Sequence, residues 1–254
     1  MPEFAVAAML FAAGVLAGVL NAVAGGGSFV TFPALLATGI APLAANATNA
    51  LAVWPGHALA VFADRRALRD RSRGTGASML AALAGAAAGA LLLDQVGNER
   101  FRVLIPWLIL FATLLFAFGP RLQQRLAARA PRPDSRGSAI LRRAAEFTLA
   151  VYGGFFGAGL GVMLMAGLQM LGHDDIRLCN SLKNLLATVI GTMSVAVLLL
   201  TGWVSLWHAA WPFAGAVIGG LAGARLARML PARWLRAAVV LAGVALCAHY
   251  FRQP

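Results

Sequence analysis

Long apolar runs alternate with short polar segments along nearly the whole chain. Runs such as 79–93 and 103–119 contain no charged residue. A helix of about 20 apolar residues spans the hydrocarbon core of a bilayer, so these runs predict an all-α polytopic membrane protein with about eight to ten membrane segments. The expected segments are residues 4–24, 28–39, 43–63, 77–93, 103–119, 145–160, 161–172, 177–200, 203–224 and 232–251.

Three of these segments, 28–39, 145–160 and 161–172, are short for a membrane crossing. At a rise of 1.5 Å per residue, a helix over 28–39 covers only about 18 Å, whereas the hydrocarbon core is about 30 Å thick. Each short segment begins or ends at a cluster of glycines. We therefore expect short broken or re-entrant helices at both places.

The sequence AVAGGGSFV at 22–30 places Gly25, Gly26 and Gly27 where an apolar helix would otherwise continue. Glycine inside a helix is destabilising by roughly 1 kcal/mol relative to alanine. The run therefore predicts that one helix stops and another starts inside the membrane, with Ser28 as the N-cap of the second. Free backbone N–H groups at such a break would point into a cavity lined by protein.

Other glycines follow the small-xxx-small spacing that lets membrane helices pack closely. This spacing occurs in three of the segments, at Gly14/Gly18, Gly85/Gly89 and Gly215/Gly219. Close packing is therefore the alternative explanation for the glycine run. Three successive glycines favour a helix break.

The two halves of the chain share one order of features. In each half, a glycine cluster precedes a short apolar segment, a polar turn and a helix that begins with amide residues. NATNALAV at 46–53 corresponds to NSLKNLLA at 180–187, and within these stretches Asn49-Ala50-Leu51-Ala52 matches Asn184-Leu185-Leu186-Ala187. Each half holds an odd number of segments, so the second inserts upside down, and inverted repeats with broken helices are typical of secondary transporters. The predicted organisation is a first transmembrane repeat at 1–120, a basic cytoplasmic linker at 121–143 and a second, inverted repeat at 144–254.

Charge is scarce and is concentrated between the apolar runs. Charged residues make up 12% of the chain, about half of the roughly 25% found in soluble domains. Arginines cluster at 64–76, 120–144 and 225–236, and cytoplasmic loops are where such residues collect. This assignment places both termini outside the cytoplasm. The net charge of +12 does not form a basic stripe interleaved with aromatics, so no nucleic-acid partner is expected.

Polar side chains within the predicted segments are candidates for a substrate site. Lys183 lies about two turns into its helix, where an unpaired cation costs at least about 2.5–3.5 kcal/mol. A bound anion would pair with it, and snorkelling to the interface is the alternative. Amide and hydroxyl groups at matching places in the two halves either donate to an anion or join helices by hydrogen bonds. These groups belong to Asn46, Thr48, Asn49, Asn180, Ser181 and Asn184.

His57 follows Pro55 and Gly56 in the third segment. It either carries a coupling proton or is a neutral side chain bonded to a carbonyl that the proline leaves free. Asn21 and Gln169 flank the glycine-rich regions. Each amide bonds either the ligand or a backbone group that a helix break sets free, and we expect the second role for Gln169.

Carboxylates are nearly absent from the apolar segments, and Glu146 stands just inside one beside Arg142 and Arg143. A carboxylate proton relay is therefore not expected, and helix N-termini near a cation favour an anionic substrate. The sequence contains no nucleotide-binding loop and no metal-ligand spacing, so no cofactor is expected. The candidate substrate-binding residues are Gly25, Gly26, Gly27, Ser28, Asn46, Thr48, Asn49, Gly159, Gly161, Asn180, Lys183 and Asn184, with His57 as a candidate for ion coupling.

Two stretches resemble a known family. They are GVLAGVLNAVAGGGSFVTFPALLATGIAPLAANATN at 14–49 and the weaker GGFFGAGLGVMLMAGL at 153–168 with NSLKN at 180–184. Both resemble the TauE/SafE sulfite exporter family of membrane permeases, and the resemblance covers essentially the whole chain. It implies transport of sulfur-containing anions such as sulfite, sulfonates or sulfoacetate, usually outward. It also implies a location in the plasma membrane, the inner membrane of a bacterial cell.

The predicted function is secondary transport of a small anion, by alternating access at a midplane site between the two repeats. An anion channel is the alternative. An intramembrane hydrolase with Ser28 as nucleophile and His57 as its partner is disfavoured, because GGGSF is not a strand-to-helix nucleophile elbow. We therefore expect no enzyme activity. The predicted partners are the small anion and the lipid bilayer, while the coupling ion and a homo-oligomeric state are left open.

Overall fold

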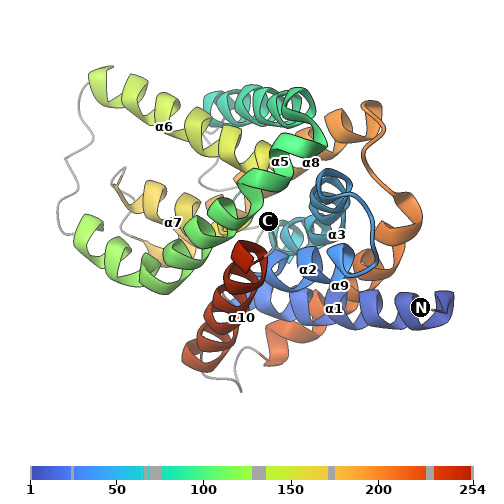
Figure 1. Cartoon of the computed structure of the whole chain (residues 1–254). Helices are drawn as coiled ribbons and strands as arrows, with labels where there is room; N and C mark the ends of the chain where they lie inside the picture. The colour runs from blue at the N-terminus through green and yellow to red at the C-terminus, as the bar shows by residue number, and fades with distance from the viewer. Residues whose placement is uncertain are drawn as a thin grey trace.

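Helices make up the described structure. The computed structural model describes residues 2–23, 26–63, 65, 68, 76–127, 136–170, 175–226 and 232–252. Within these ranges the chain is helical and has no strands, which confirms the all-α prediction. The helices in Figure 1 are α1 (Glu3–Val23), α2 (Ser28–Leu36), α3 (Pro42–Ala63), α5 (Gly76–Ala127), α6 (Arg136–Phe155), α7 (Leu160–Met170), α8 (Ile176–Leu200), α9 (Leu206–Leu226) and α10 (Ala232–Arg252).

Most helices begin and end near their predicted bounds, and the differences lie in α5 and α6. The predicted segments 77–93 and 103–119 are joined in α5, which bends at Gly97 (φ 69°, ψ 171°), a conformation open to glycine. Helix α6 ends at Phe155 rather than near residue 160. The predicted linker is also partly helical, because α5 extends to Ala127 and α6 begins at Arg136. The residues between these helices lie outside the described ranges.

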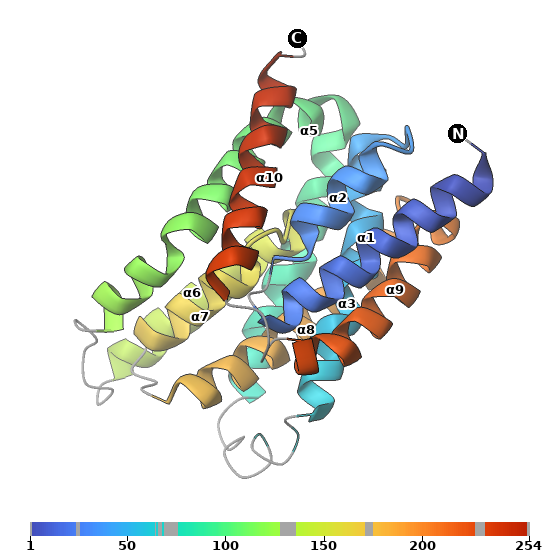
Figure 2. The same ribbon diagram turned by 90° about the horizontal axis from the view of Figure 1, so that it is seen from below.

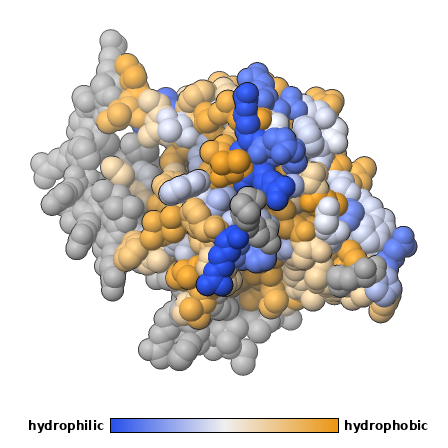
Figure 3. All heavy atoms as spheres, viewed as in Figure 1, coloured by the Kyte–Doolittle hydropathy of each residue, from blue (hydrophilic) through white to orange (hydrophobic). Residues whose placement is uncertain are grey.

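Lengths and surfaces of the helices suit a membrane. In the described part of the chain, three helical stretches are long and apolar enough to cross a bilayer: Glu3–Asn21, Gly76–Gly119 and Leu178–Leu200. Large apolar side chains are exposed, for example Leu200 at 89%, and apolar residues spread over much of the face in Figure 3. Soluble monomers rarely expose such large apolar areas, so lipid is the natural surrounding for this surface.

Glycines allow two pairs of helices to pack with their backbones in contact, and these are called the locked pairs below. A Cβ atom added at any of four glycines between α1 and α9 would overlap with backbone of the facing helix: Gly14, Gly18, Gly215 and Gly219. Three glycines play the same part between α5 and α6, namely Gly85, Gly89 and Gly154. Small residues at this spacing let two backbones touch. The predicted close packing is therefore confirmed at these positions.

Each locked pair joins helices from opposite halves of the sequence. Helix α1 packs on α9, and α6 packs on the first part of α5; Figure 2 shows α1 and α9 side by side. Between the pairs, α3 packs against α8, while α3 also contacts α9 and α8 contacts α5. The two halves are therefore interleaved. Figure 2 also places the start of α1 and the end of α10 at the same end of the bundle, as the predicted location of both termini requires.

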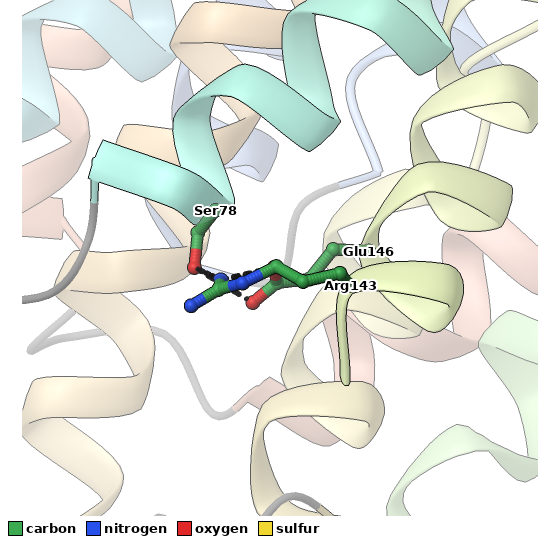
Figure 4. A network of polar contacts seen from close by, with 3 residues as sticks. All are labelled: Ser78, Arg143 and Glu146. Carbon is green, nitrogen blue, oxygen red and sulfur yellow. Dashed lines mark hydrogen bonds and ion pairs between the residues drawn. The ribbon is translucent and has the colours of Figure 1, made fainter. Parts of the chain in front are cut away.

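A buried ion pair extends the contact between α5 and α6 (Figure 4). Arg143 Nη1 donates to Glu146 Oε2 at 2.7 Å, and Ser78 Oγ donates to Glu146 Oε1 at 2.9 Å. Arg143 also hydrogen bonds to the Ser78 hydroxyl. Glu146 is only 5% exposed, so it lies deeper than the sequence indicates. Its charge is neutralised by Arg143, which is the condition for keeping a carboxylate buried.

Candidate functional site

The first predicted helix break is present: α1 ends at Val23 and α2 begins at Ser28. Gly27 is the N-cap residue and has no side-chain cap, so the prediction that Ser28 caps α2 is wrong. Ser28 already belongs to the first turn, where its hydroxyl is not placed to cap the helix. Instead, Asn21 Oδ1 accepts a hydrogen bond from the Gly27 N–H at 2.8 Å. Asn21 therefore satisfies a backbone group that the break sets free, which is one of the two roles open to it from the sequence. Gly25 lies outside the described residues.

A buried contact joins the start of α2 to α3. Thr31 Oγ1 hydrogen bonds to Asn49 Oδ1 and also lies 3.2 Å from the Gly27 carbonyl oxygen. Thr31 is fully buried, and Asn49 is 3% exposed. Because the Asn49 oxygen faces Thr31, its NH₂ group is the donor left for other partners.

The second predicted break is also present, between Phe155 at the end of α6 and Leu160 at the start of α7. Gly157 and Gly159 within it have φ of 74° and 77°, a left-handed conformation that side chains with a Cβ atom avoid. The Tyr152 hydroxyl donates to the Ala158 carbonyl at 2.5 Å. The break is therefore held by its own backbone conformation and by a side chain of α6.

Asn46 joins the first half to this second break. Its Nδ2 donates to the Phe155 carbonyl at 2.9 Å, across the interface from α3 to the last residue of α6. Asn46 is 3% exposed, and its Oδ1 has no partner among the described residues. The Asn46 NH₂ group therefore joins two helices, which is one of the two roles open to this residue from the sequence.

A small cavity lies between the two breaks. Its volume is about 50 Å³, enough for a few water molecules at ~10–15 Å³ each or for one small oxyanion. The first residues of both α2 and α7, Ser28 and Leu160, line it. The helix starts of both halves thus meet at one space. Its lining consists of Asn21, Ser28, Asn49, Ala50, Val53, Trp54, His57, Gly153, Phe156, Gly157, Leu160, Gly161, Ala187, Ile190, Gly191 and Ser194.

The polar lining of the cavity is neutral or titratable, not permanently charged. None of the described residues that line it is Asp, Glu, Lys or Arg. The amides of Asn21 and Asn49, the hydroxyls of Ser28 and Ser194 and the His57 imidazole are the side chains that offer hydrogen bonds. Such a lining offers hydrogen bonds without a fixed charge.

Four of the sequence candidates line this cavity: Ser28, Asn49, Gly161 and His57. Gly26, Gly27 and Gly159 form the breaks without lining the cavity. Thr48 accepts a hydrogen bond from the Ser205 N–H at 3.0 Å, just before α9, so it joins two helices. Asn180 is exposed. The structure does not bring Thr48 and Asn180 to the cavity.

Lys183 and Asn184 lie on α8 behind His57 rather than in the cavity wall. Both are buried, at 8% and 5% exposure. The His57 imidazole hydrogen bonds to the Asn184 side chain, and the Lys183 ammonium is close enough to act on it electrostatically. His57 therefore links the cavity to the one lysine of the chain. Its partner is the Asn184 side chain rather than a carbonyl freed by Pro55.

Several lining residues are not found by sequence reasoning. Trp54 and Ser194 look like ordinary members of apolar helices. Gly191 carries a usable signal, because it follows Asn184 at the same spacing by which Gly56 follows Asn49. Gln169 does not behave as predicted, since its Oε1 is buried and has no partner in the described structure.

Comparison with known proteins gives a match over nearly the whole chain. Residues 10–250 match the sulfite exporter TauE/SafE family. A probable membrane transporter protein of Haemophilus influenzae is 31% identical over 245 residues, covering 92% of this chain and 90% of that protein. The probable membrane transporter protein ORF9 of a Sinorhizobium species is 27% identical over 99% of this chain and 94% of its own length. The probable membrane transporter protein YfcA of Escherichia coli K12 is 27% identical over 94% of this chain and 87% of its own. No solved structure matches.

Proposed function

The chain belongs to the sulfite exporter TauE/SafE family of membrane transporters, and we propose that it exports small sulfur-containing anions such as sulfite or sulfonates. The anion binds in the cavity between the two helix breaks, and transport proceeds by alternating access. The membrane is the inner membrane of a bacterial cell, with the arginine-rich segments on the cytoplasmic side. Families of this kind act by transport, and no enzyme activity is proposed.

One observation carries this proposal: the first residues of α2 and α7 line the same cavity. The N-terminus of a helix carries about half a positive charge. Two such ends, together with the Asn49 amide and the Ser28 hydroxyl, attract an oxyanion. A carboxylate in the lining would repel it, and the described lining has none. Binding by neutral donors also leaves the anion free to depart, which a transporter requires.

Lys183 gives this site a further positive potential. Lys183 lies behind His57, which itself lines the cavity. An anion in the cavity favours a proton on His57, and the imidazole is therefore our candidate for the coupling group. Asn184 holds the ring through its hydrogen bond.

The interleaved packing supports alternating access. Each locked pair, α1 with α9 and α5 with α6, carries one broken helix, and the cavity lies between them, beside α3 and α8. Each of these contacts has a counterpart in which the two halves change places. The contact of α1 with α9 corresponds to that of α6 with α5, and the contact of α3 with α9 corresponds to that of α8 with α5. A two-fold relation of inverted repeats accounts for this exchange.

Reconstitution tests the proposal. Purified protein in proteoliposomes should take up radiolabelled sulfite in a saturable manner and show counterflow, whereas a channel shows no counterflow. Lys183→Ala should reduce uptake severely while the protein still inserts. The matched control is Asn180→Ala, about one turn earlier on α8 and exposed. Sulfite kinetics unchanged in Lys183→Ala would remove Lys183 from the mechanism, and absence of uptake of any anion in a labelled panel would overturn the proposal.

A further inference from the structure

Trp54 forms one wall of the cavity and reaches from one half of the chain to the other. It lies in the middle of α3 and lines the cavity. Its indole Nε1 donates to Thr192 Oγ1 of α8 at 2.9 Å. Thr192 is exposed, while Trp54 is half-buried. The indole therefore stands between the cavity and the protein surface on the side of Thr192.

Two features of α8 hold the indole in this place. The Thr192 hydroxyl donates to the Thr188 carbonyl at 2.8 Å, so its lone pairs remain for the indole N–H, which is a donor only. Gly191 leaves room for the ring: a Cβ atom there would lie 3.0 Å from Trp54 Cδ1. An aromatic side chain with two rotatable bonds, anchored at its edge, makes a rigid wall.

We infer that Trp54 sets the upper size limit of the transported anion, an inference that rests on the proposed binding of the anion in this cavity. A volume of about 50 Å³ holds the oxyanion group and little more. An organic tail on the anion has to extend toward one wall. On the side of α8 this wall is the indole, which the bond to Thr192 prevents from swinging away.

The test uses straight-chain alkanesulfonates, from methanesulfonate to butanesulfonate, as competitors of radiolabelled sulfite uptake into proteoliposomes. In the wild type, inhibition should weaken as the chain lengthens. Trp54→Ala should lower the half-inhibitory concentration of butanesulfonate by at least about tenfold, because a change of one methylene in a fitted pocket is worth roughly 10–200-fold. The half-inhibitory concentrations are compared relative to the sulfite uptake that each variant retains. The matched control, Trp107→Ala, removes a tryptophan that is 60% exposed on α5 and should leave the chain-length profile unchanged.

Gly191→Ala should change the chain-length profile of inhibition in the opposite direction. It tests the inference if Trp54→Ala does not insert into the membrane. Because Gly191 itself lines the cavity, the added methyl group narrows the space beside the indole, so inhibition by ethanesulfonate should weaken relative to wild type. If the wild type takes up sulfite but Trp54→Ala and Gly191→Ala keep its chain-length profile, the size limit is not set by Trp54 and the inference is overturned. If wild-type proteoliposomes take up no sulfite at all, the proposed function fails and the inference fails with it.

Discussion

The two helix breaks place equivalent helix starts at one cavity, but their glycines are needed for different reasons. At the first break, Gly27 has ordinary helical angles (φ −58°, ψ −36°), and what it supplies is space. A Cβ atom there would lie 2.7 Å from Asn21 Nδ2 and 2.8 Å from the Ala17 carbonyl oxygen. At the second break, Gly159 has φ of 77° while the nearest atoms to an added Cβ lie 3.7 Å away. At this position glycine is needed because the backbone is in the left-handed conformation.

The side chains that hold the two breaks differ as well. The first is held from within its own half, by Asn21 on the Gly27 N–H and by the contact of Thr31 with Asn49. The second is held by Tyr152 from its own half and also by Asn46, which reaches it from the other half. A glycine cluster in a membrane segment therefore indicates a break, but it does not say which physical requirement the glycines meet.

The largest effect is expected at Gly27. Gly27→Leu forces its side chain against the Ala17 carbonyl, which is backbone and moves only if α1 moves. We expect no measurable sulfite uptake into proteoliposomes. Gly76→Leu is the control, because an added side chain at this helix start meets nothing within 4 Å. Normal uptake by Gly27→Leu would show that close approach of α1 to the break is not required.

A smaller loss is expected from Asn46→Ala. This change leaves the partly buried Phe155 carbonyl without its donor, and the loss of a hydrogen bond costs about 0.5–1.5 kcal/mol. For a chain of this length, 1 kcal/mol lowers Tm by about 2–4 °C, which thermal unfolding in detergent would measure. Asn180→Ala on the exposed face of α8 should leave Tm unchanged. An equally stable Asn46→Ala protein would mean that the second break does not depend on the first half.

Gly159 is needed for its backbone conformation and Gly27 for the space it leaves. Alanine and asparagine should therefore rank in opposite order of stability at the two positions. At Gly159, alanine costs roughly 1–2 kcal/mol because of the left-handed conformation, and asparagine, which tolerates it, costs less. At Gly27 the smaller alanine should be tolerated better than asparagine. The measurement is the Tm in detergent of Gly159→Ala, Gly159→Asn, Gly27→Ala and Gly27→Asn. Alanine better than asparagine at both positions would remove the distinction drawn between the two breaks.

Local features of the sequence predict the helices and both breaks. Apolar length and glycine clusters are properties of short stretches, and α1, α2 and α3 follow them closely. The early end of α6 at Phe155 is not predicted, because the apolar pattern runs on through GGFF to Gly157, where the left-handed backbone stops the helix.

The site is predicted less completely, because it depends on which helices face each other. Ser28, Asn49 and His57 are polar residues beside a break or a proline, and they do line the cavity. Asn46 and Thr48 have the same appearance in the sequence, yet they face α6 and the residue before α9. Trp54 forms a wall of the cavity because Gly191 of α8 leaves room for its ring.

The central claim is that an anion binds between the two helix starts, and Asn49→Asp tests it most directly. The change alters almost nothing in shape but places a carboxylate in the cavity lining. Equilibrium binding of radiolabelled sulfite to the purified protein should weaken by at least roughly fivefold, since like charges at about 4 Å repel by about 1 kcal/mol in water and about 4 kcal/mol near a protein surface. Asn180→Asp, the same change on an exposed part of α8, should bind sulfite as the wild type does. Wild-type affinity in Asn49→Asp would contradict the account.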